Sequence, residues 1–491
     1  MHLKMKIPRI MSTQHPDNVT IPFFAEKSVM EGEDEIKEAF YTFSHLGADE
    51  QLWDAEGKEV DAFVVKKLLS RYEPYFRQKI LGKDKFITLR VPNPEVEKNE
   101  AKILLEALHS LPRNYDLAKA FYENNTPPIF EVAVPMCSSE KSIQRVHEYY
   151  KEVIVKSQDK TICDVKLKDW VGELKPLDIK TIPLFETKEA ILNSADYVEK
   201  YLDYAKIRDY QRVWFARSDP ALNYGSTATV LIIKVGLQRL YQLQQKTGIQ
   251  ILPIIGCGSA PFRGNFTPLN AEKMVAGYPS VQTFTIQSAF KYDYPAPQVM
   301  QAIERVQNTE RGVPLLVDES QVLSLIEKLE REYQHCINQI APKIALISPY
   351  IPARRKRKLH IGLFGYARKQ GEISLPRAIT FCASLYSLGL PPDALGLSVL
   401  EKSDLEQIRT YYKTIDDDMK AALQYVNKNN LDFFGSDIKE KVLQALELFD
   451  VEINKEHQAV SSDVLEALKR NDTLALQEHI LKAAQIRRFL G

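Results

Sequence analysis

One histidine, two carboxylates and a glycine-rich loop carry the side chains of this chain that could do chemistry. His15 lies in the motif Thr13-Gln14-His15-Pro16-Asp17-Asn18, whose last three residues favour a turn. A histidine held on such a loop can accept or donate a proton near neutral pH. It could equally be a surface residue, so its interpretation depends on what the rest of the chain places beside it.

The two carboxylates follow two successive apolar segments. Glu186 comes directly after residues 181–185, and Asp219 comes shortly after residues 211–215. A pair of carboxylates holds Mg²⁺ or Mn²⁺ and leaves coordination positions for water and substrate oxygens. We therefore predict a metal site formed by Glu186 and Asp219, with helix capping by each carboxylate as the alternative.

The glycine-rich loop spans residues 256–265 and contains Arg263. Its backbone N–H groups and its arginine suit a phosphate or a carboxylate, although a tight turn alone would also explain the glycines. It matches neither the P-loop nor the dinucleotide-binding pattern. With Arg90 and Arg217 adding positive charge, the set fits a metal-bound, multiply anionic substrate whose reaction passes through an enolate or a phosphoryl transfer.

Eight short apolar segments, mostly separated by helical patterns, must position these residues. They are predicted strands over residues 6–11, 50–53, 86–91, 128–135, 181–185, 211–215, 250–255 and 281–286. Strands that alternate with helices indicate parallel βαβ units, and eight of them predict a closed (β/α)8 TIM-type barrel over residues 1–295. The residues at the carboxyl ends of these strands are His15, Asp54, Arg90, Glu186, Asp219, Gly256 and Gln287, and we expect them on one rim.

The remaining residues, 296–491, show helical patterns, which predict an α-helical C-terminal region packed on the barrel and not independent of it. The longest irregular segment, 348–373, contains the basic run Arg354-Arg355-Lys356-Arg357-Lys358. We predict that this run is a solvated loop away from the metal site, because exposed charges usually lie in loops and contribute little.

Composition excludes several functional classes. The 491 residues include 65 Lys+Arg and 65 Asp+Glu, so no overall field favours nucleic acid or a membrane surface. The five scattered cysteines include no CxxC pair, which argues against a disulfide framework or a structural zinc site and fits a reducing cytosol. No apolar run approaches the roughly 20 residues that span a bilayer, and no secretory signal is visible. We expect a cytoplasmic protein.

Several motifs together resemble the phosphoenolpyruvate carboxylases, in particular their short, archaeal-type branch. These motifs are Thr13–Asn18, Pro183–Thr187, Ser218–Ala221, Arg263-Gly264, Leu375–Ile379 and Arg487–Gly491. Their order and spacing cover nearly the whole chain.

The resemblance implies an enzyme that converts phosphoenolpyruvate and bicarbonate to oxaloacetate and phosphate through carboxyphosphate and a metal-bound enolate. It implies Mg²⁺ or Mn²⁺ on Glu186 and Asp219, His15 and Arg263 as catalytic residues, and Arg90 as a substrate-binding residue. It also implies a homotetramer that serves anaplerotic CO2 fixation for the tricarboxylic acid cycle.

The longer enzymes of this family have further charged groups that this chain lacks. Their second histidine, a further arginine and a lysine correspond to Ile255, Cys257 and Leu222 here. We expect Arg217, Lys291 and Arg368 to replace those charges. The predicted substrate-binding set is Arg90, Arg217, Gly258, Gly264, Gln287 and Lys291.

Two other functions remain open at this point. One is another metal-dependent barrel lyase that acts on phosphoenolpyruvate or pyruvate enolates without bicarbonate. The other is a regulatory scaffold that uses the basic run 354–358 to bind nucleic acid or acidic partners.

Overall fold

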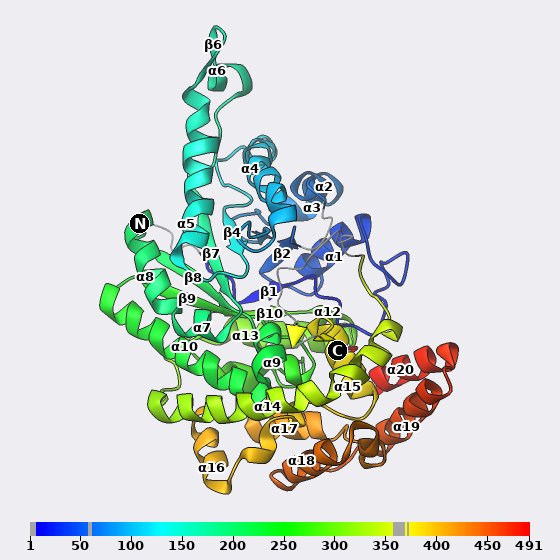
Figure 1. Ribbon diagram of the computed structural model, residues 1–491. Helices are drawn as coiled ribbons and strands as arrows, with labels where there is room; N and C mark the ends of the chain where they lie inside the picture. The colour runs from blue at the N-terminus through cyan, green and yellow to red at the C-terminus, as the bar shows by residue number, and fades with distance from the viewer. Residues whose placement is uncertain (1–5, 57–60, 357–368, 371–372) are drawn as a thin grey trace.

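A closed barrel of eight parallel strands lies at the centre of the computed structural model, which describes residues 6–56, 61–356, 369–370 and 373–491 (Figure 1). The strand order around the barrel is β1-β10-β9-β8-β7-β4-β3-β2. The strands are β1 (Ile10–Ser12), β2 (Glu50–Asp54), β3 (Phe86–Arg90), β4 (Glu131–Val134), β7 (Lys180–Phe185), β8 (Tyr210–Phe215), β9 (Gln250–Ile255) and β10 (Thr283–Ile286). The predicted (β/α)8 fold and all eight predicted strands are confirmed. β1 begins later than predicted, at Ile10, and the N–H groups of Arg9 and Ile10 both donate to the Asp49 carboxylate, at 3.1 and 3.3 Å.

Helices surround the barrel on its outside. They are α1 (Glu33–Ser44), α2 (Val64–Arg71), α3 (Glu73–Phe76), α4 (Ala101–Tyr122), α5 (Glu140–Glu148), α7 (Lys188–Leu192), α8 (Ser194–Ala205), α9 (Ser218–Tyr224), α10 (Ser226–Thr247), α11 (Ala271–Gly277), α12 (Ser288–Tyr292) and α13 (Ala296–Asn308). α10 is buried along most of its length because the C-terminal helix α14 (Glu319–Ile347) packs on it. A helix covered in this way is apolar on nearly all sides.

The interior of the barrel has a charged layer and an apolar layer. Arg212 of β8 is fully buried and pairs with Glu50 at 2.7 Å and with Glu131 at 2.6 Å. Two residues further along β8, Trp214 belongs to a buried apolar cluster with Leu184 and Ile254. The apolar layer therefore lies between the buried ion triad and the carboxyl ends of the strands.

The C-terminal region is helical, as predicted. Besides α14 it contains α15 (Ala378–Ser387), α16 (Lys402–Tyr411), α17 (Ile415–Leu423), α18 (Ser436–Glu447), α19 (Lys455–Lys469) and α20 (Thr473–Arg487). The sequence pattern predicts one continuous helix over residues 404–428 and another over residues 462–490. The structure has α16 and α17 in place of the first, and the end of α19 followed by α20 in place of the second. α13, the first helix after the predicted boundary at residue 296, packs against β1 and α11 of the barrel region. The division of the chain into two regions at that residue stays a prediction. Among the described residues, the helices are all too short or too polar to cross a bilayer.

Residues 149–172 form an arm that projects from the barrel beyond α5 (Figure 1). It consists of η2 (Tyr149–Ile154), η3 (Val155–Asp159), the hairpin β5 (Thr161–Ile162) and β6 (Val165–Lys166), and α6 (Leu167–Val171). Cys163 lies in the hairpin turn with a φ of 57°. Trp170 is 66% exposed near the tip of the arm. The residue pattern of this segment predicts no strand.

The basic run is not the solvated loop that the sequence analysis predicted. Arg354 and Arg355 are buried, and Arg355 pairs with Glu35 at 2.9 Å and with Glu38 at 2.8 Å. The prediction is wrong for Arg355 because the buried carboxylates of α1 require a cationic partner. It is wrong for Arg354 as well, whose guanidinium group donates to the Val19 carbonyl at 3.2 Å. Lys356 is exposed as expected, while Arg357, Lys358 and the candidate Arg368 lie outside the described residues.

Candidate active site

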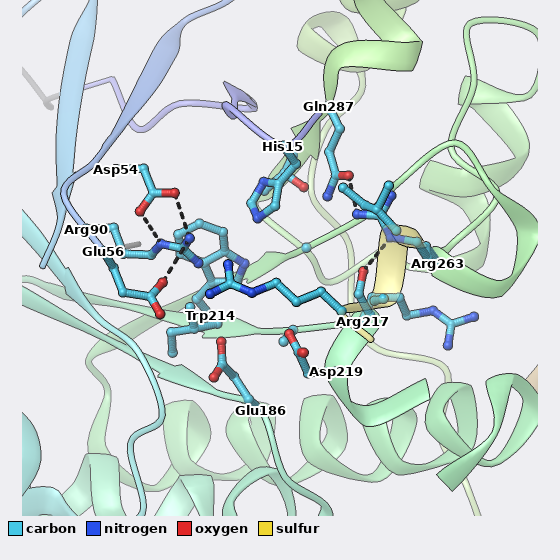
Figure 2. A pocket seen from close by; sticks show the side chains of 18 of the residues that line it. His15, Asp54, Glu56, Arg90, Glu186, Trp214, Arg217, Asp219, Arg263 and Gln287 are labelled. Atoms are coloured by element: carbon cyan, nitrogen blue, oxygen red, sulfur yellow. Dashed lines mark hydrogen bonds and ion pairs between the residues drawn. The ribbon is translucent and has the colours of Figure 1, made fainter. Parts of the chain in front are cut away.

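A pocket of about 110 Å³ lies at the carboxyl ends of the barrel strands (Figure 2). Its charged and polar lining includes His15, Asp54, Glu56, Arg90, Glu186, Arg217, Asp219, Arg263, Gln287 and Arg377. This volume is below the roughly 300 Å³ typical of pockets for drug-sized ligands, so a small anionic ligand fits it best. A larger cavity of about 1120 Å³, lined by Lys85 and Lys180 at the starts of β3 and β7, contains none of the predicted site residues.

The two predicted metal ligands reach this pocket from neighbouring strands. β7 and β8 pair at Phe185 and Phe215, so Glu186 and Asp219 emerge side by side. Thr187, and not Glu186, caps α7, because its hydroxyl accepts the Ala190 N–H at 3.2 Å. Asp219 lies in the first turn of α9, for which the described residues show no side-chain cap. The helix-cap interpretation therefore fails for Glu186.

The donor set formed by Glu186 and Asp219 suits a hard divalent cation. Mg²⁺ is commonly bound by one or two carboxylates, with water and substrate oxygens completing its shell. Within the described ranges, no cluster of three or more His, Cys, Asp or Glu side chains could hold a metal ion. Two carboxylates at the edge of a small pocket leave the remaining coordination positions for oxygens of a ligand.

His15 follows β1 and lines the pocket. Its ring Nδ1 lies 2.9 Å from Thr13 Oγ1, and its backbone carbonyl accepts the Ser288 N–H at 3.2 Å. Figure 2 shows the ring directed toward the space above Trp214. Nδ1 thus contacts a protein side chain, and the imidazole ring borders the pocket.

Arg263 is almost completely buried, and its guanidinium group has four protein partners (Figure 2). It donates to Ser218 Oγ at 3.1 Å, Asp17 Oδ2 at 3.2 Å, the Gly491 carbonyl at 2.7 Å and Gln287 Oε1 at 2.5 Å. These contacts fix the orientation of the guanidinium before any ligand binds.

The glycines of the loop shape the packing around Arg263. A Cβ atom on Gly258 would lie 2.9 Å from Arg263 Nη1 and 3.1 Å from Gln287 Oε1. Gly264 has a φ of +127°, which favours glycine. Gly256 lines the pocket, whereas Gly258 and Gly264, which were predicted to bind substrate, are not among its lining residues.

The other arginines differ in their partners. Arg90 forms two hydrogen bonds to Asp54, at 2.8 and 2.7 Å, and an ion pair with Glu56 at 3.0 Å. Arg217 is buried and donates to the Ser226 carbonyl at 3.1 Å. The pocket therefore holds Arg90 and Arg217 as predicted, each with a protein acceptor.

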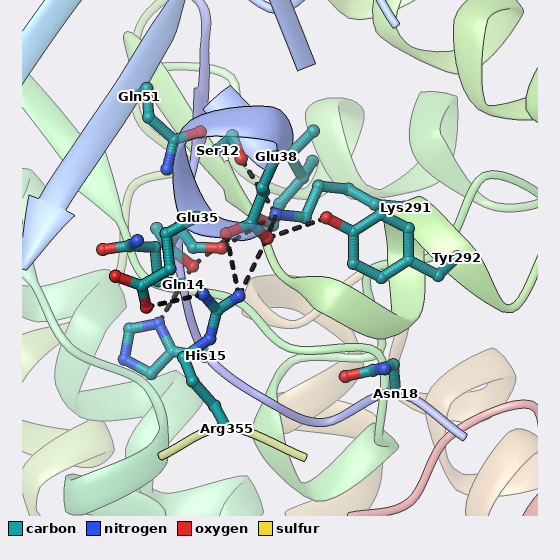
Figure 3. Close-up of polar contacts among 12 residues, drawn as sticks. Ser12, Gln14, His15, Asn18, Glu35, Glu38, Gln51, Lys291, Tyr292 and Arg355 are labelled. Atoms are coloured by element: carbon teal, nitrogen blue, oxygen red, sulfur yellow. Dashed lines mark hydrogen bonds and ion pairs between the residues drawn. The ribbon is translucent and has the colours of Figure 1, made fainter. Parts of the chain in front are cut away.

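Lys291 does not line the pocket (Figure 3). Its ammonium group is fully buried and donates to Glu38 at 2.8 Å and to Ser12 Oγ and the Thr13 carbonyl at 3.0 Å each. The structure does not support the predicted contact of Lys291 with substrate, because α12 directs this side chain toward α1.

Several residues of the site were not predicted from the sequence, among them Arg377, Asp17 and Trp214. Arg377 lines the pocket from the segment before α15, and the motif Leu375–Ile379 was the signal that could have identified it. Asp17 holds Arg263 and lies within the His15 motif. Trp214 forms part of the apolar floor, and only its alternation with Arg212 along β8 pointed to the barrel interior.

The fold and this pocket define a (β/α)8-barrel enzyme with a site for a small anion, built from a histidine, two carboxylates and several arginines at the carboxyl ends of the strands. The family model for phosphoenolpyruvate carboxylase matches residues 7–491. The phosphoenolpyruvate carboxylase of Methanothermobacter thermautotrophicus is 47% identical over 488 residues, which cover 99% of this chain and 100% of that protein. The phosphoenolpyruvate carboxylase of Pyrococcus abyssi is 49% identical over 485 residues, which cover 99% of this chain and 100% of that protein. The chain belongs to the phosphoenolpyruvate carboxylase family, which confirms the resemblance found in the sequence.

Proposed function

We propose that this chain carboxylates phosphoenolpyruvate with bicarbonate to give oxaloacetate and phosphate. One observation carries the proposal: a single small pocket brings Glu186 and Asp219 together with His15 and Arg263. Membership of the family supports it further. A cytoplasmic location, a homotetramer and an anaplerotic role are part of the same proposal and rest on the family resemblance.

Glu186 and Asp219 would hold Mg²⁺ or Mn²⁺, which supplies positive charge toward a substrate oxygen when bound. The phosphate and carboxylate of the substrate require further cations. Arg263, Arg377 and Arg90 are the arginines of the pocket that offer guanidinium groups from three different segments. Planar guanidinium groups bind carboxylate and phosphate oxygens with defined geometry.

The reaction begins when a bicarbonate oxygen attacks phosphorus, which gives carboxyphosphate and the enolate of pyruvate. Arg263 is fixed by its four contacts and binds the carboxyphosphate without reorganising. His15 accepts the proton of the carboxyphosphate, which then breaks into CO2 and phosphate. The enolate carbon attacks CO2 to give oxaloacetate. Leu184 and Trp214 form an apolar floor that limits the access of water to these intermediates.

The test is a coupled assay of the purified protein with malate dehydrogenase and NADH, run with and without added bicarbonate. We expect NADH oxidation that requires phosphoenolpyruvate, bicarbonate and Mg²⁺ or Mn²⁺. Bicarbonate-independent consumption of phosphoenolpyruvate would instead indicate another barrel lyase. The scaffold alternative has lost its main support, because Arg354 and Arg355 are buried.

A further inference from the structure

One buried carboxylate, Glu38 of α1, joins three separate parts of the chain behind the His15 loop (Figure 3). It accepts hydrogen bonds from Lys291 at 2.8 Å, from the Tyr292 hydroxyl at 2.7 Å and from Arg355 at 2.9 and 2.8 Å. Burial alone would raise the pKa of Glu38, but Arg355 and Lys291 outweigh burial and lower it to about 2. Glu38 is therefore ionised and anchors both cations.

The Lys291 ammonium group donates two further hydrogen bonds to residues at the end of β1. It donates to Ser12 Oγ and to the Thr13 carbonyl, each at 3.0 Å. These are the residues that lead directly into His15. A buried lysine carries a large desolvation cost, so its three acceptors fix it in one place and fix the strand end with it.

The Thr13 side chain connects this strand end to the His15 ring. Thr13 Oγ1 lies 2.9 Å from His15 Nδ1 and 3.5 Å from the Ile286 carbonyl. The hydroxyl has a single proton, and the Ile286 carbonyl, which can only accept, lies where it can take that proton. With the hydroxyl in that orientation its oxygen lone pairs face the ring, Nδ1 carries the imidazole proton and Nε2 keeps its lone pair.

We propose that Lys291 and Thr13 are positioning residues that hold the neutral His15 ring as the Nδ1–H tautomer, with Nε2 as the proton acceptor. This inference rests on the proposed function, in which His15 accepts the carboxyphosphate proton. The neighbour of a catalytic imidazole determines which nitrogen is protonated, and the wrong tautomer cannot act as the base.

The first measurement is the tautomer itself, recorded without substrate. ¹⁵N spectra of histidine-labelled protein, taken by magic-angle spinning at a pH where His15 is neutral, distinguish a protonated Nδ1 from a protonated Nε2. His15→Asn assigns the signal. We expect Nδ1–H in the parent protein and in Thr13→Ser, and a shift toward Nε2–H in Thr13→Val. A protonated Nε2 in the parent protein would overturn the proposal.

The second measurement is the rate of oxaloacetate formation. Thr13→Val and Lys291→Met should lower kcat about 10- to 100-fold with little change in KM for phosphoenolpyruvate, the usual loss when an outer hydrogen-bond partner is removed. Thr13→Ser should recover most of the rate. The double variant should be no slower than the slower single variant, because both act on the same ring.

Tyr292→Phe is the matched control, since Tyr292 shares Glu38 with Lys291 but donates to no residue of the His15 loop. It should keep kcat within about twofold of the parent, because the hydrogen bond that it removes lies outside the site and does not involve the His15 loop. Equal losses in Tyr292→Phe and Lys291→Met, or additive losses in the double variant, would refute the role of Lys291. If Lys291→Met does not fold, Lys291→Met combined with Glu38→Gln removes both charges, and Thr13→Val tests the tautomer independently. A parent protein without carboxylase activity would refute the proposed function, whereas the spectra would still decide the tautomer.

Discussion

The same substitution at the adjacent residues Arg355 and Lys356 should lower stability to very different extents. Arg355 is buried between Glu35 and Glu38, whereas the Lys356 side chain is 62% exposed and pairs with Glu31 at the surface. Arg355→Gln and Lys356→Gln each remove one positive charge from the basic run. The two variants therefore separate a buried ion cluster from a solvated loop.

The expected magnitudes follow from burial. Removing one partner of a buried, hydrogen-bonded ion pair costs about 3–5 kcal/mol, because the remaining carboxylates stay buried without that charge. An exposed ion pair contributes at most about 1 kcal/mol. With an unfolding entropy of roughly 1 kcal/mol/K for a chain of this length, Arg355→Gln should lower Tm by roughly 3–5 °C and Lys356→Gln by roughly 1 °C or less.

The pH dependence gives a further check. The Glu38 carboxylate has a folded-state pKa lowered to about 2, against an ordinary value of 4.5, so its contribution to stability is present above pH 4.5 and is lost as the pH falls toward 2. The difference in unfolding free energy between the parent protein and Arg355→Gln should be largest near neutral pH and should shrink as the pH falls toward 2, because Glu38 in the folded variant takes up a proton at a higher pH than in the folded parent. Urea unfolding at each pH measures it. Equal destabilisation by Arg355→Gln and Lys356→Gln at pH 7 would refute the buried cluster.

Three further predictions concern the site and a buried lysine beside it. Glu186→Gln and Asp219→Asn should abolish activity at limiting Mg²⁺ while the far-UV spectrum and Tm stay unchanged, because an amide binds the cation poorly; full activity in either would remove that residue from the metal site. His15→Asn should release phosphate and pyruvate without oxaloacetate, and Arg263→Ala should slow oxaloacetate formation by about 10²- to 10³-fold; parent-like product ratios in His15→Asn would exclude it as the proton acceptor. Burial and the charge of the neighbouring Arg217 lower the pKa of Lys234 from 10.5 to about 7. Between pH 7 and 10.5 the lysine therefore binds more protons in the unfolded state than in the folded state, so its contribution to the free energy of unfolding rises with pH over that range. Lys234→Met should lose that slope and gain on the order of 3 kcal/mol at pH 7 in urea unfolding, whereas an unchanged slope would show that Lys234 is not the cause.

The barrel could be predicted from sequence because each strand is a short apolar run bounded by turn residues, and because parallel strands place their carboxyl ends on one rim. This local signal placed Glu186, Asp219 and His15 correctly around one pocket. The helical C-terminal region was likewise visible from periodicity, although the breaks between α16 and α17 and between α19 and α20 were not.

Two of the failures involve partners that are distant in sequence. The sequence pattern predicts an exposed basic loop at Arg355, because its partners Glu35 and Glu38 lie some 320 residues earlier in the chain. The sequence pattern predicts that Lys291 binds substrate at the rim of the barrel, because it does not reveal that the side chain extends from α12 to Glu38 of α1. The arm was missed because its strands are two residues long, too short for an alternating pattern.

The arm gives the protein a built-in site for a spectroscopic probe. Cys163 is exposed in the hairpin turn, whereas Cys137, Cys257, Cys336 and Cys382 are buried and burial raises the pKa of each thiol. A maleimide dye at neutral pH should therefore attach to Cys163 alone, without removal of any other cysteine. Because the arm projects away from the barrel, energy transfer between dyes on different copies would report where the arms lie in an assembly, independently of catalysis.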